Sequence, residues 1–221
     1  MGVVLLVRHG QASFGADDYD VLSRTGVEQS RMLGRALAAQ GVVPAHVVHG
    51  TMRRQRDTAK AMVEGGGWEV VPELDDGWNE FDHLAVVRRS LDDPDAVVGL
   101  DRRAFQELFE EATSRWSGGA FDEEYAESWP AFLRRTTDAL DRAVARDGTT
   151  VVVSSGGPIA AVCATLVDPA ASGHQVARLW NAFNTVNTNA SVTRVLDGST
   201  GRRLLSFNEH SHLPRDLVTY R

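Results

Sequence analysis

Residues 3–10, VVLLVRHG, decide the fold class of this chain. The segment begins with five consecutive apolar residues, three of them valines, which is typical of a strand buried on both faces of a parallel sheet. It ends in a histidine between an arginine and a glycine, and the end of such a strand is where α/β proteins bind their ligands. A loop follows, and Ser23 then stands where it can cap a helix whose apolar residues keep helical spacing as far as Leu37.

The alternation of strand and helix continues along the chain. Short apolar segments predict a second strand at 47–49 and a third at 68–71, which Pro72 ends, with a helix from about 53 to 63 between them. Later we expect an amphipathic helix at 130–146, a strand at 149–153, a helix ending at 167, and two strands between 190 and 207 around a turn at 197–201. This order predicts an α/β fold, namely a three-layer α/β/α sandwich with a mostly parallel central sheet.

The stretch from about residue 82 to 129 interrupts this alternation. It is acidic and contains short helical patterns, such as the one at 105–109, together with the loop Ser117-Gly118-Gly119. Because about fifty residues rarely sustain a hydrophobic core alone, we expect a single domain over residues 1–221. The stretch at 82–129 is then a helical lid inserted over the C-terminal edge of the strands.

Composition and charge exclude several classes of protein. The chain has 221 residues, a net charge of −7 and a pI near 5.5, which argues against a nucleic-acid or anionic-membrane partner held by bulk charge. No apolar run approaches the ~18 residues that a membrane span needs, and the N-terminal segment predicts a strand rather than a signal peptide. Cys163, the only cysteine, excludes an internal disulfide and a cysteine-based zinc site. We therefore expect a cytoplasmic protein, whose oligomeric state the sequence leaves open.

Polar side chains follow each of the four predicted parallel strands, at the edge where such sheets bind ligands. These four segments are Arg8-His9-Gly10, Arg53-Arg54-Gln55-Arg56, Trp78-Asn79-Glu80-Phe81-Asp82 and Ser154-Ser155-Gly156-Gly157. A neutral imidazole can attack phosphorus, guanidinium and backbone N–H groups can hold the negative charge, and a carboxylic acid can protonate the leaving alcohol. Together they predict phosphoryl transfer, although the arginines alone could be a solvated helix face and the glycines a simple turn.

Four motifs, in order along the chain, resemble those of the histidine phosphatase superfamily, the phosphoglycerate mutase-like proteins. They are LVRHGQA at 6–12, LSRTGVEQ at 22–29, TMRRQRDTA at 51–59 and the segment from Asn208 to Leu213. The resemblance runs from residue 3 to about 213 and is thin only across the insertion. It implies an enzyme that works through a phosphohistidine, without a metal or other cofactor, on a small phosphorylated substrate.

The resemblance also assigns roles to individual residues. His9 matches the nucleophile, and Arg8 and Arg54 match the arginines that clamp the phosphate. Arg54 fits better than its arginine neighbours because it stands four residues before Thr58, as the family's arginine does.

The proton donor of the family lies after the third strand, in a segment that Trp78-Asn79-Glu80 resembles. Glu80 is therefore the expected proton donor, with Asp82 and Asp76 as alternatives. Any one of these three carboxylates, taken alone, could equally be a solvated loop side chain.

The chain departs from the family pattern after the fourth strand. Family members usually carry a second catalytic histidine there, before a glycine, whereas this chain has Ser155 followed by Gly156. A serine hydroxyl can still donate a hydrogen bond to phosphate, but it brings no charge. Family members often also carry an asparagine shortly after the first histidine, and here Gln11 and Ser13 are the candidate contacts. Another histidine could also take the second place in space; the candidates are His49, His83, His210 and His212.

Three functions remain open on the sequence alone. The first is a phosphomonoester hydrolase that acts through His9, with activity reduced by Ser155. The second is a catalytically weak or inactive relative that binds a phosphorylated ligand or a protein partner. The third, a phosphoglycerate mutase, is disfavoured because mutases resemble one another in a Glu-Arg-His-Tyr-Gly segment, where this chain has Glu80-Phe81-Asp82-His83.

Overall fold

The computed structural model describes residues 2–13, 20–91 and 102–220. In this part of the chain, six strands form one sheet in the order β3-β2-β4-β1-β5-β6. The strands are β1 (Gly2–Arg8), β2 (His46–His49), β3 (Glu73–Leu74), β4 (Thr149–Ser154), β5 (Val192–Gly198) and β6 (Gly201–Glu209). The first four are parallel, whereas β5 and β6 form the expected antiparallel hairpin beside β1.

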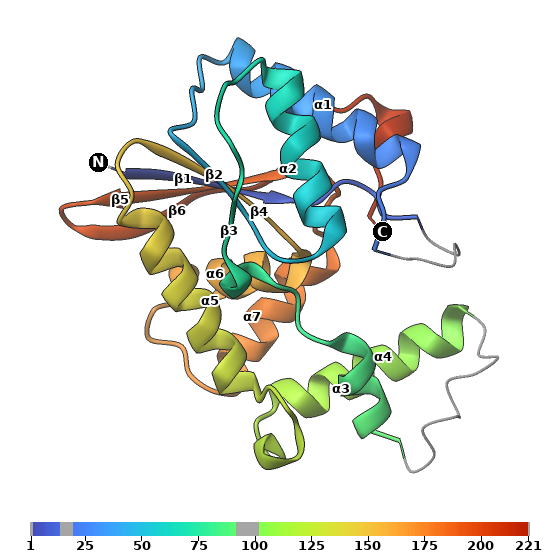
Figure 1. Cartoon of the computed structure of the whole chain (residues 1–221). Helices are drawn as coiled ribbons and strands as arrows, with labels where there is room; N and C mark the ends of the chain where they lie inside the picture. Colours follow the sequence, from blue (N-terminus) through green and yellow to red (C-terminus); the bar gives the residue numbers. More distant parts are fainter. Residues whose placement is uncertain (1, 14–19, 92–101, 221) are drawn as a thin grey trace.

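Helices cover both faces of this sheet (Figure 1). They are α1 (Arg24–Ala39), α2 (Arg53–Gly66), α3 (His83–Arg89), α4 (Arg102–Ser117), α5 (Trp129–Val144), α6 (Gly156–Val167) and α7 (His174–Thr185). Helices α1 and α2 lie on one face, and α5 and α6 lie on the other, with α7 packed against α6 (Figure 1). The predicted three-layer α/β/α architecture with a mostly parallel sheet is therefore confirmed, while α7 had no counterpart in the sequence prediction.

The side chains of β1 alternate between the two helical layers. Leu5 and Val7 pack with α1 and α2, whereas Val4 and Leu6 pack with α5 and α6. Neighbouring β4 runs in register with β1, so that Arg8 lies opposite Ser154. Since side chains alternate along a strand, His9 continues the face of Val7 and turns toward α2.

The prediction of a third strand at residues 68–71 is wrong. Residues 68–72 form no strand, and β3 is instead the pair Glu73–Leu74, opposite Val48 and His49 of β2. Trp68 and Val70 do pack against the core in the alternating manner of a strand. In this register, however, residues 68–70 lie beyond the start of the short β2, and Pro72 has no N–H to donate to it. The apolar pattern of residues 68–71 indicates burial of Trp68 and Val70, but it does not show whether a neighbouring strand is there to pair with them.

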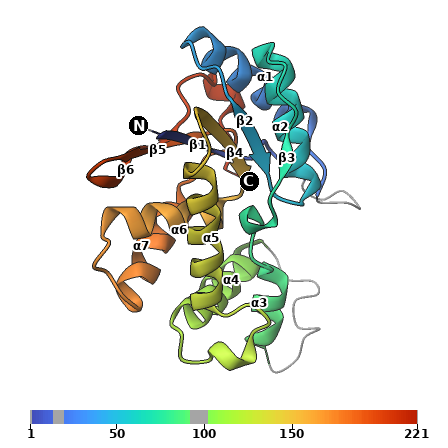
Figure 2. The ribbon, with the colours of Figure 1, turned by 60° about the vertical axis from the view of Figure 1, so that its left-hand side comes forward.

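The insertion after residue 82 packs beside the lower end of α5, as Figure 1 and Figure 2 both show. Its centre is Trp116 of α4, whose ring stacks on Phe81 at a centroid distance of 4.7 Å. Three further rings from two other helices surround this pair; they belong to Trp129 and Phe132 of α5 and to Trp180 of α7. We call Phe81, Trp116, Trp129, Phe132 and Trp180 the aromatic cluster. It joins the insertion to α5 and α7.

None of the helices in the described ranges is long and apolar enough to span a membrane.

Candidate active site

His9 lies at the end of β1, where it is 5% exposed. Its Nδ1 is 2.7 Å from the carbonyl oxygen of Gly10, which can only accept, so Nδ1 carries the proton. Nε2 therefore presents a lone pair, and it accepts a hydrogen bond from Arg54 Nε at 3.2 Å. Burial, followed by the charges of Arg54 and Arg8, holds the pKa of His9 well below its usual value. The imidazole is consequently neutral near pH 7, with Nε2 as its nucleophilic atom.

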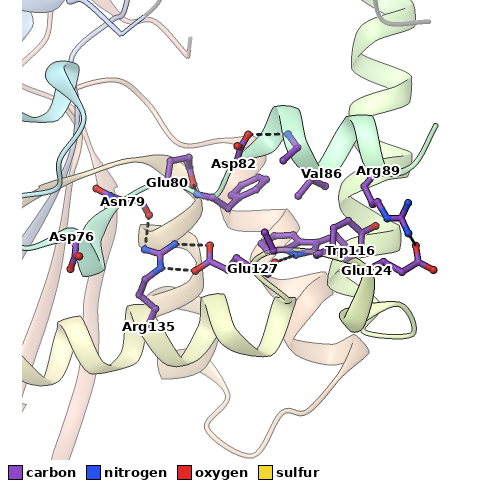
Figure 3. A pocket seen from close by; sticks show the side chains of 14 residues that line it. Asp76, Asn79, Glu80, Asp82, Val86, Arg89, Trp116, Glu124, Glu127 and Arg135 are labelled. Carbon is purple, nitrogen blue, oxygen red and sulfur yellow. Dashed lines mark hydrogen bonds and ion pairs between the residues drawn. The ribbon is translucent and has the colours of Figure 1, made fainter. Parts of the chain in front are cut away.

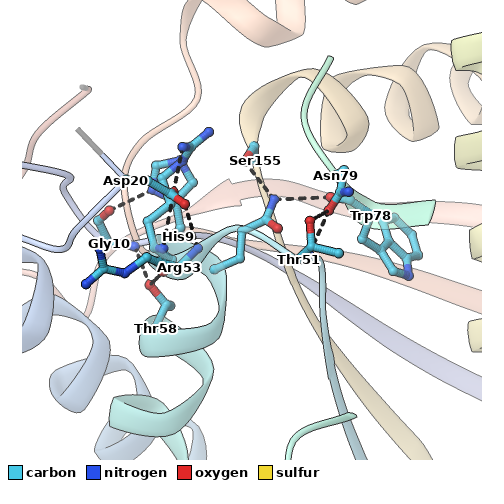
Figure 4. A network of polar contacts seen from close by, with 11 residues as sticks. His9, Gly10, Asp20, Thr51, Arg53, Thr58, Trp78, Asn79 and Ser155 are labelled. Atoms are coloured by element: carbon cyan, nitrogen blue, oxygen red, sulfur yellow. Dashed lines mark hydrogen bonds and ion pairs between the residues drawn. The ribbon is translucent and has the colours of Figure 1, made fainter. Parts of the chain in front are cut away.

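Arg54 stands in the first turn of α2 and is held there by Asp20. Asp20 Oδ1 accepts from Arg54 Nη1 at 2.9 Å, and Oδ2 accepts from the backbone N–H of Arg53 at 2.8 Å (Figure 4). One carboxylate therefore caps the start of α2, which Met52 cannot do with its own side chain, and also fixes the guanidinium beside His9. Thr58, one turn further along α2, accepts from the backbone N–H of Gly10 at 2.9 Å and so holds the loop after His9.

Arg8 is held in place by residues 187–190, the segment that precedes β5. Its Nη1 donates to the carbonyl oxygen of Asn187, and Asn189 Nδ2 donates to the carbonyl oxygen of His9 at 3.1 Å. Ala190, in a left-handed backbone conformation with φ 55°, donates its N–H to the carbonyl oxygen of Arg8 at 3.0 Å. The segment before β5 thus fixes the backbone that carries both Arg8 and His9.

Glu80 reaches the same site from the loop between β3 and α3. Its Oε2 accepts from the backbone N–H of Gly157, at the start of α6, at 3.1 Å, and its Oε1 accepts from the N–H of Phe81 at 3.2 Å. Burial raises the pKa of Glu80, and the N–H of Gly157 and the charges of Arg54 and Arg8 offset only part of this rise. A half-buried carboxyl that keeps its proton to higher pH is suited to act as an acid.

Gly157 is required for this approach, because a Cβ at this position would lie 2.1 Å from Glu80 Oε1. The two alternative carboxylates are placed differently. Asp82 is exposed and caps α3 by accepting from the N–H of Ala85, and Asp76 is exposed in the short turn before Trp78.

Ser155 is 1% exposed and lies between β4 and α6, next to His9, whose N–H donates to the carbonyl oxygen of Ser154 at 2.9 Å. Its Oγ accepts from Gln55 Nε2 at 2.9 Å (Figure 4). Gly156 follows at the first position of α6, and a Cβ there would lie 2.7 Å from Asn184 Oδ1 and 3.9 Å from Arg8 Nε. Ser155 and Gly156 therefore border the site that His9 and Arg8 also border.

Gln11 and Ser13 are oriented by their neighbours along the chain. Gln11 Oε1 accepts from Ser23 Oγ at 2.9 Å, so its side chain is tied to the start of α1. The N–H of Ser13 donates to the carbonyl oxygen of Val21 at 2.7 Å, immediately before residues 14–19, which lie outside the described ranges. The hydrogen bonds described for these two residues thus join them to Ser23 and Val21, at the entrance to α1.

Of the other histidines, His83 at the start of α3 is affected by the charge of Arg54. Burial, and then the charge of Arg54, lower its pKa, while Asp82 raises it. His49 donates from Nδ1 to the carbonyl oxygen of Gly50 at 2.6 Å, at the end of β2. His210 and His212 lie in the segment after β6, where burial lowers the pKa of His212.

A pocket of about 580 Å³ adjoins Glu80 on the side of the insertion (Figure 3). It is lined by the segment that carries Glu80, by α3, by Trp116 of α4, by residues 124–127 and by Arg135 of α5, and its cations are engaged in ion pairs. Arg89 pairs with Glu124 at 3.3 Å, and Arg135 pairs with Glu127 at 2.6 Å. Arg135 Nη1 also donates to the carbonyl oxygen of Asn79 at 2.8 Å, so this pocket wall holds the loop that carries Glu80.

Within the described residues, no three His, Cys, Asp or Glu side chains are grouped closely enough to hold a metal ion. The functional groups of the site are an imidazole, two guanidinium groups, a carboxyl whose pKa is raised, a hydroxyl and the N–H groups at the start of α6. This set can bind an anion, attack it with a nitrogen nucleophile and protonate a leaving group.

The sequence model of the histidine phosphatase superfamily (branch 1) matches residues 4–210 of the chain. The protein belongs to this superfamily. No curated protein matches it in sequence.

Solved structures share its fold at low sequence identity. A phosphoserine phosphatase from Entamoeba histolytica, solved with phosphoserine, has a TM-score of 0.67 at 18% identity over 97% of this chain and 100% of its own. A mycobacterial glucosyl-3-phosphoglycerate phosphatase with VO3 has a TM-score of 0.65 at 22% identity over 94% and 99%. A phosphoglycerate mutase from Bacillus anthracis has a TM-score of 0.62 at 17% identity over 95% and 94%. These likenesses concern the fold.

Sequence reasoning missed the residues that hold the site together. Asp20, Gln55 and Asn189 each contact a site residue through a hydrogen bond that joins distant parts of the chain. Gln55 stands directly after Arg54 within a motif that was recognised, so its position was visible although its role was not. For Asn189 no local signal exists, since it is 180 residues away from the carbonyl oxygen that it holds.

Proposed function

We propose that the protein is a phosphomonoester hydrolase in which His9 Nε2 attacks phosphorus. A nitrogen–phosphorus bond forms, the bond from phosphorus to the ester oxygen breaks, and Glu80 gives its proton to the leaving alcohol. Water then attacks the phosphohistidine, Glu80 takes back a proton, and inorganic phosphate leaves with His9 regenerated. The observation that carries this proposal is the pairing of a neutral, buried His9 with a half-buried Glu80 whose pKa is raised.

In this proposal Arg8, Arg54, Ser155 and the N–H of Gly156 hold the phosphoryl oxygens. Arg54 Nε now donates to His9 Nε2, so a bound phosphate would draw this donor away and free the lone pair for attack. Ser155 takes the place where family members carry a second histidine. A hydrogen bond from a charged group contributes about 1.5–3 kcal/mol and one from a neutral group about 1 kcal/mol. The exchange therefore slows turnover by roughly one power of ten.

The insertion is proposed as the lid that selects the substrate, because loops and inserted segments over a rigid sheet edge carry specificity. Its acidic character disfavours polyphosphates and bisphosphates and favours a small monoester such as a sugar phosphate. Neither a metal nor another cofactor has a step in this mechanism.

The test is the hydrolysis of p-nitrophenyl phosphate by the wild type and by His9→Ala, in EDTA, between pH 4 and 9. We expect wild-type turnover to survive EDTA and His9→Ala to lose it by roughly 10³-fold or more, because the nucleophile is gone. Equal turnover by the two proteins would contradict the proposal.

The second candidate, a phosphate-binding protein without turnover, is favoured by one observation, the neutral Ser155 beside His9. In that case His9→Ala would keep its affinity for inorganic phosphate, and the wild type would show no hydrolysis.

A further inference from the structure

Gln55 is a fully buried amide at the start of α2, with 0% of its surface exposed. Its Nε2 donates twice, to the carbonyl oxygen of Trp78 at 3.1 Å and to Ser155 Oγ at 2.9 Å (Figure 4). It therefore links the loop before Glu80 to the hydroxyl beside His9. The mechanism described above gives Gln55 no role.

The orientation of this amide is fixed by chemistry. The carbonyl oxygen of Trp78 can only accept a hydrogen bond, so the amide nitrogen, and not the amide oxygen, must face it. The second hydrogen of the same nitrogen then points at Ser155 Oγ, which becomes the acceptor. The proton of the Ser155 hydroxyl is consequently directed away from Gln55, and no described residue accepts it.

The remaining direction for the Ser155 hydroxyl proton is toward the proposed phosphate site, over His9 and the first turn of α6. Ser155 and His9 end neighbouring parallel strands, and both turn toward α2, where Arg54 meets His9 and Gln55 meets Ser155. With Gln55 on one side, the Ser155 O–H is left to face the space over His9 and the first turn of α6. An oxygen of a phosphoryl group on His9 Nε2 is the acceptor that fits this position.

We propose that Gln55 is a positioning residue that orients the Ser155 hydroxyl as a donor to the phosphoryl group. The inference rests on the proposed function, since it assumes a phosphoryl group at His9. The Gln55–Ser155 pair supplies a donor whose strength does not change with pH, because neither side chain titrates in the working range. A second imidazole in its place would donate with a charge that depends on pH.

Gly50 supports this assignment, because it makes room for the amide. A Cβ at position 50 would lie 2.2 Å from Gln55 Oε1 and 2.7 Å from Asn79 Oδ1. Gly50→Ala should therefore displace both the Gln55 amide and the Asn79 side chain, so Gln55→Leu is the cleaner test of the amide.

The substitution Gln55→Leu should leave the fold intact. Gln55 Oε1 is buried and has no hydrogen-bond partner among the described residues, so its removal loses no bond. The carbonyl oxygen of Trp78 keeps a second donor, Ser154 Oγ at 2.8 Å. The leucine side chain is close in size to the amide that it replaces.

The experiment is a double-mutant cycle with Gln55→Leu, Ser155→Ala and the double variant, measured as kcat/KM for p-nitrophenyl phosphate between pH 5 and 8. We expect Ser155→Ala to lose roughly 5- to 10-fold, the value of one neutral hydrogen bond. Gln55→Leu should lose about 3-fold or more when Ser155 is present and less than about 2-fold when it is absent. The loss from Ser155→Ala should stay constant across this pH range.

Thr150→Val is the matched control, since it removes a buried hydroxyl from β4, the strand that precedes Ser155, where Thr150 donates to the carbonyl oxygen of Ala143. It should leave kcat/KM within about 2-fold of the wild type, which sets the scale of a purely structural disturbance. Equal losses from Gln55→Leu with and without Ser155, or no loss at all, would overturn the inference.

The dissociation constant of inorganic phosphate, measured by calorimetry for the same four proteins, separates this inference from the proposed function. Binding without turnover, with the same non-additive pattern, would refute the hydrolase and keep the role of Gln55. Turnover with additive losses in both measurements would refute only the role of Gln55. A wild type that neither binds phosphate nor hydrolyses the ester would refute both.

Discussion

The strand-end site and the aromatic cluster meet at two consecutive residues, Glu80 and Phe81. The carboxyl of Glu80 points to the start of α6, where it accepts from Gly157, while the ring of Phe81 stacks on Trp116 of the insertion. The site consists of buried polar groups joined by hydrogen bonds that span most of the chain. The cluster consists of apolar rings from separate segments, with centroid distances such as 5.1 Å between Trp116 and Trp129.

The difference between these regions lies in what each does to stability. Burying a carboxyl and an imidazole is unfavourable, and the shifted pKa values of Glu80 and His9 are the signature of that cost. Burying aromatic rings is favourable, and the cluster lies one residue away from the acid. We infer that the cluster offsets the cost of the site, so substitutions in the two regions should have opposite consequences.

The largest expected effect is a loss of catalytic rate and comes from a substitution in the strand-end site. Glu80→Gln should lower kcat by roughly 10²- to 10⁴-fold, because glutamine cannot protonate the leaving alcohol. In the wild type, kcat/KM should rise with pH as His9 loses its proton and fall again as Glu80 loses its own. The variant should lack the falling limb, and pH–rate profiles of both proteins test this.

The same substitution should not weaken the fold. Because the pKa of Glu80 is raised in the folded state, the wild type loses stability as pH rises above the pKa of the unfolded carboxyl. Glu80→Gln escapes this loss, so its Tm at pH 7 should equal or exceed that of the wild type. A clearly lower Tm would show that the carboxyl stabilises the fold, and the comparison would fail.

The reverse pattern is expected for the cluster. Trp116→Ala should lower the free energy of unfolding by about 3–5 kcal/mol, or roughly 6–20 °C in Tm, while kcat of the folded enzyme changes by less than about 5-fold. Phe121→Ala is the control, because Phe121 is an aromatic residue of the same insertion but is 44% exposed. It should cost at most about 1 kcal/mol, the value of the Arg115 contact on its ring.

A larger fall in kcat for Trp116→Ala, at a temperature where the protein is fully folded, would show that the cluster also positions Glu80 through Phe81. This outcome would show that the position of Glu80 depends on the packing of the aromatic cluster.

The smallest effect is expected for Asp20→Asn. Asparagine can still cap α2 with its amide oxygen, but it loses the charge that fixes Arg54 Nη1. We expect kcat to fall by roughly 3- to 10-fold with little change in Tm, since partly exposed ion pairs contribute about 1 kcal/mol or less. Unchanged kinetics in this variant would mean that the charge of Asp20 is not needed to position Arg54.

Much of the fold could be predicted from local patterns. The apolar run of β1, the cap at Ser23 and the hairpin of β5 and β6 are visible because each depends on residues close together in the sequence. The third strand was misplaced because burial of Trp68 and Val70 looks the same with or without a neighbouring strand. Pairing depends on the length and register of β2, which the segment itself does not encode.

The candidate functional residues also divide into those that the sequence identified and those that only the structure revealed. By itself, the sequence determined the α/β class, placed Arg8 and His9 at the end of the first strand and singled out Arg54 and Glu80. Only the tertiary structure decided that Asp20 pairs with Arg54, that Gly157 donates to Glu80 and that Gln55 donates to Ser155. These hydrogen bonds join residues between 34 and 100 positions apart. A local pattern records which face of an element is buried, but the partner of a buried polar group is fixed only when the layers pack together.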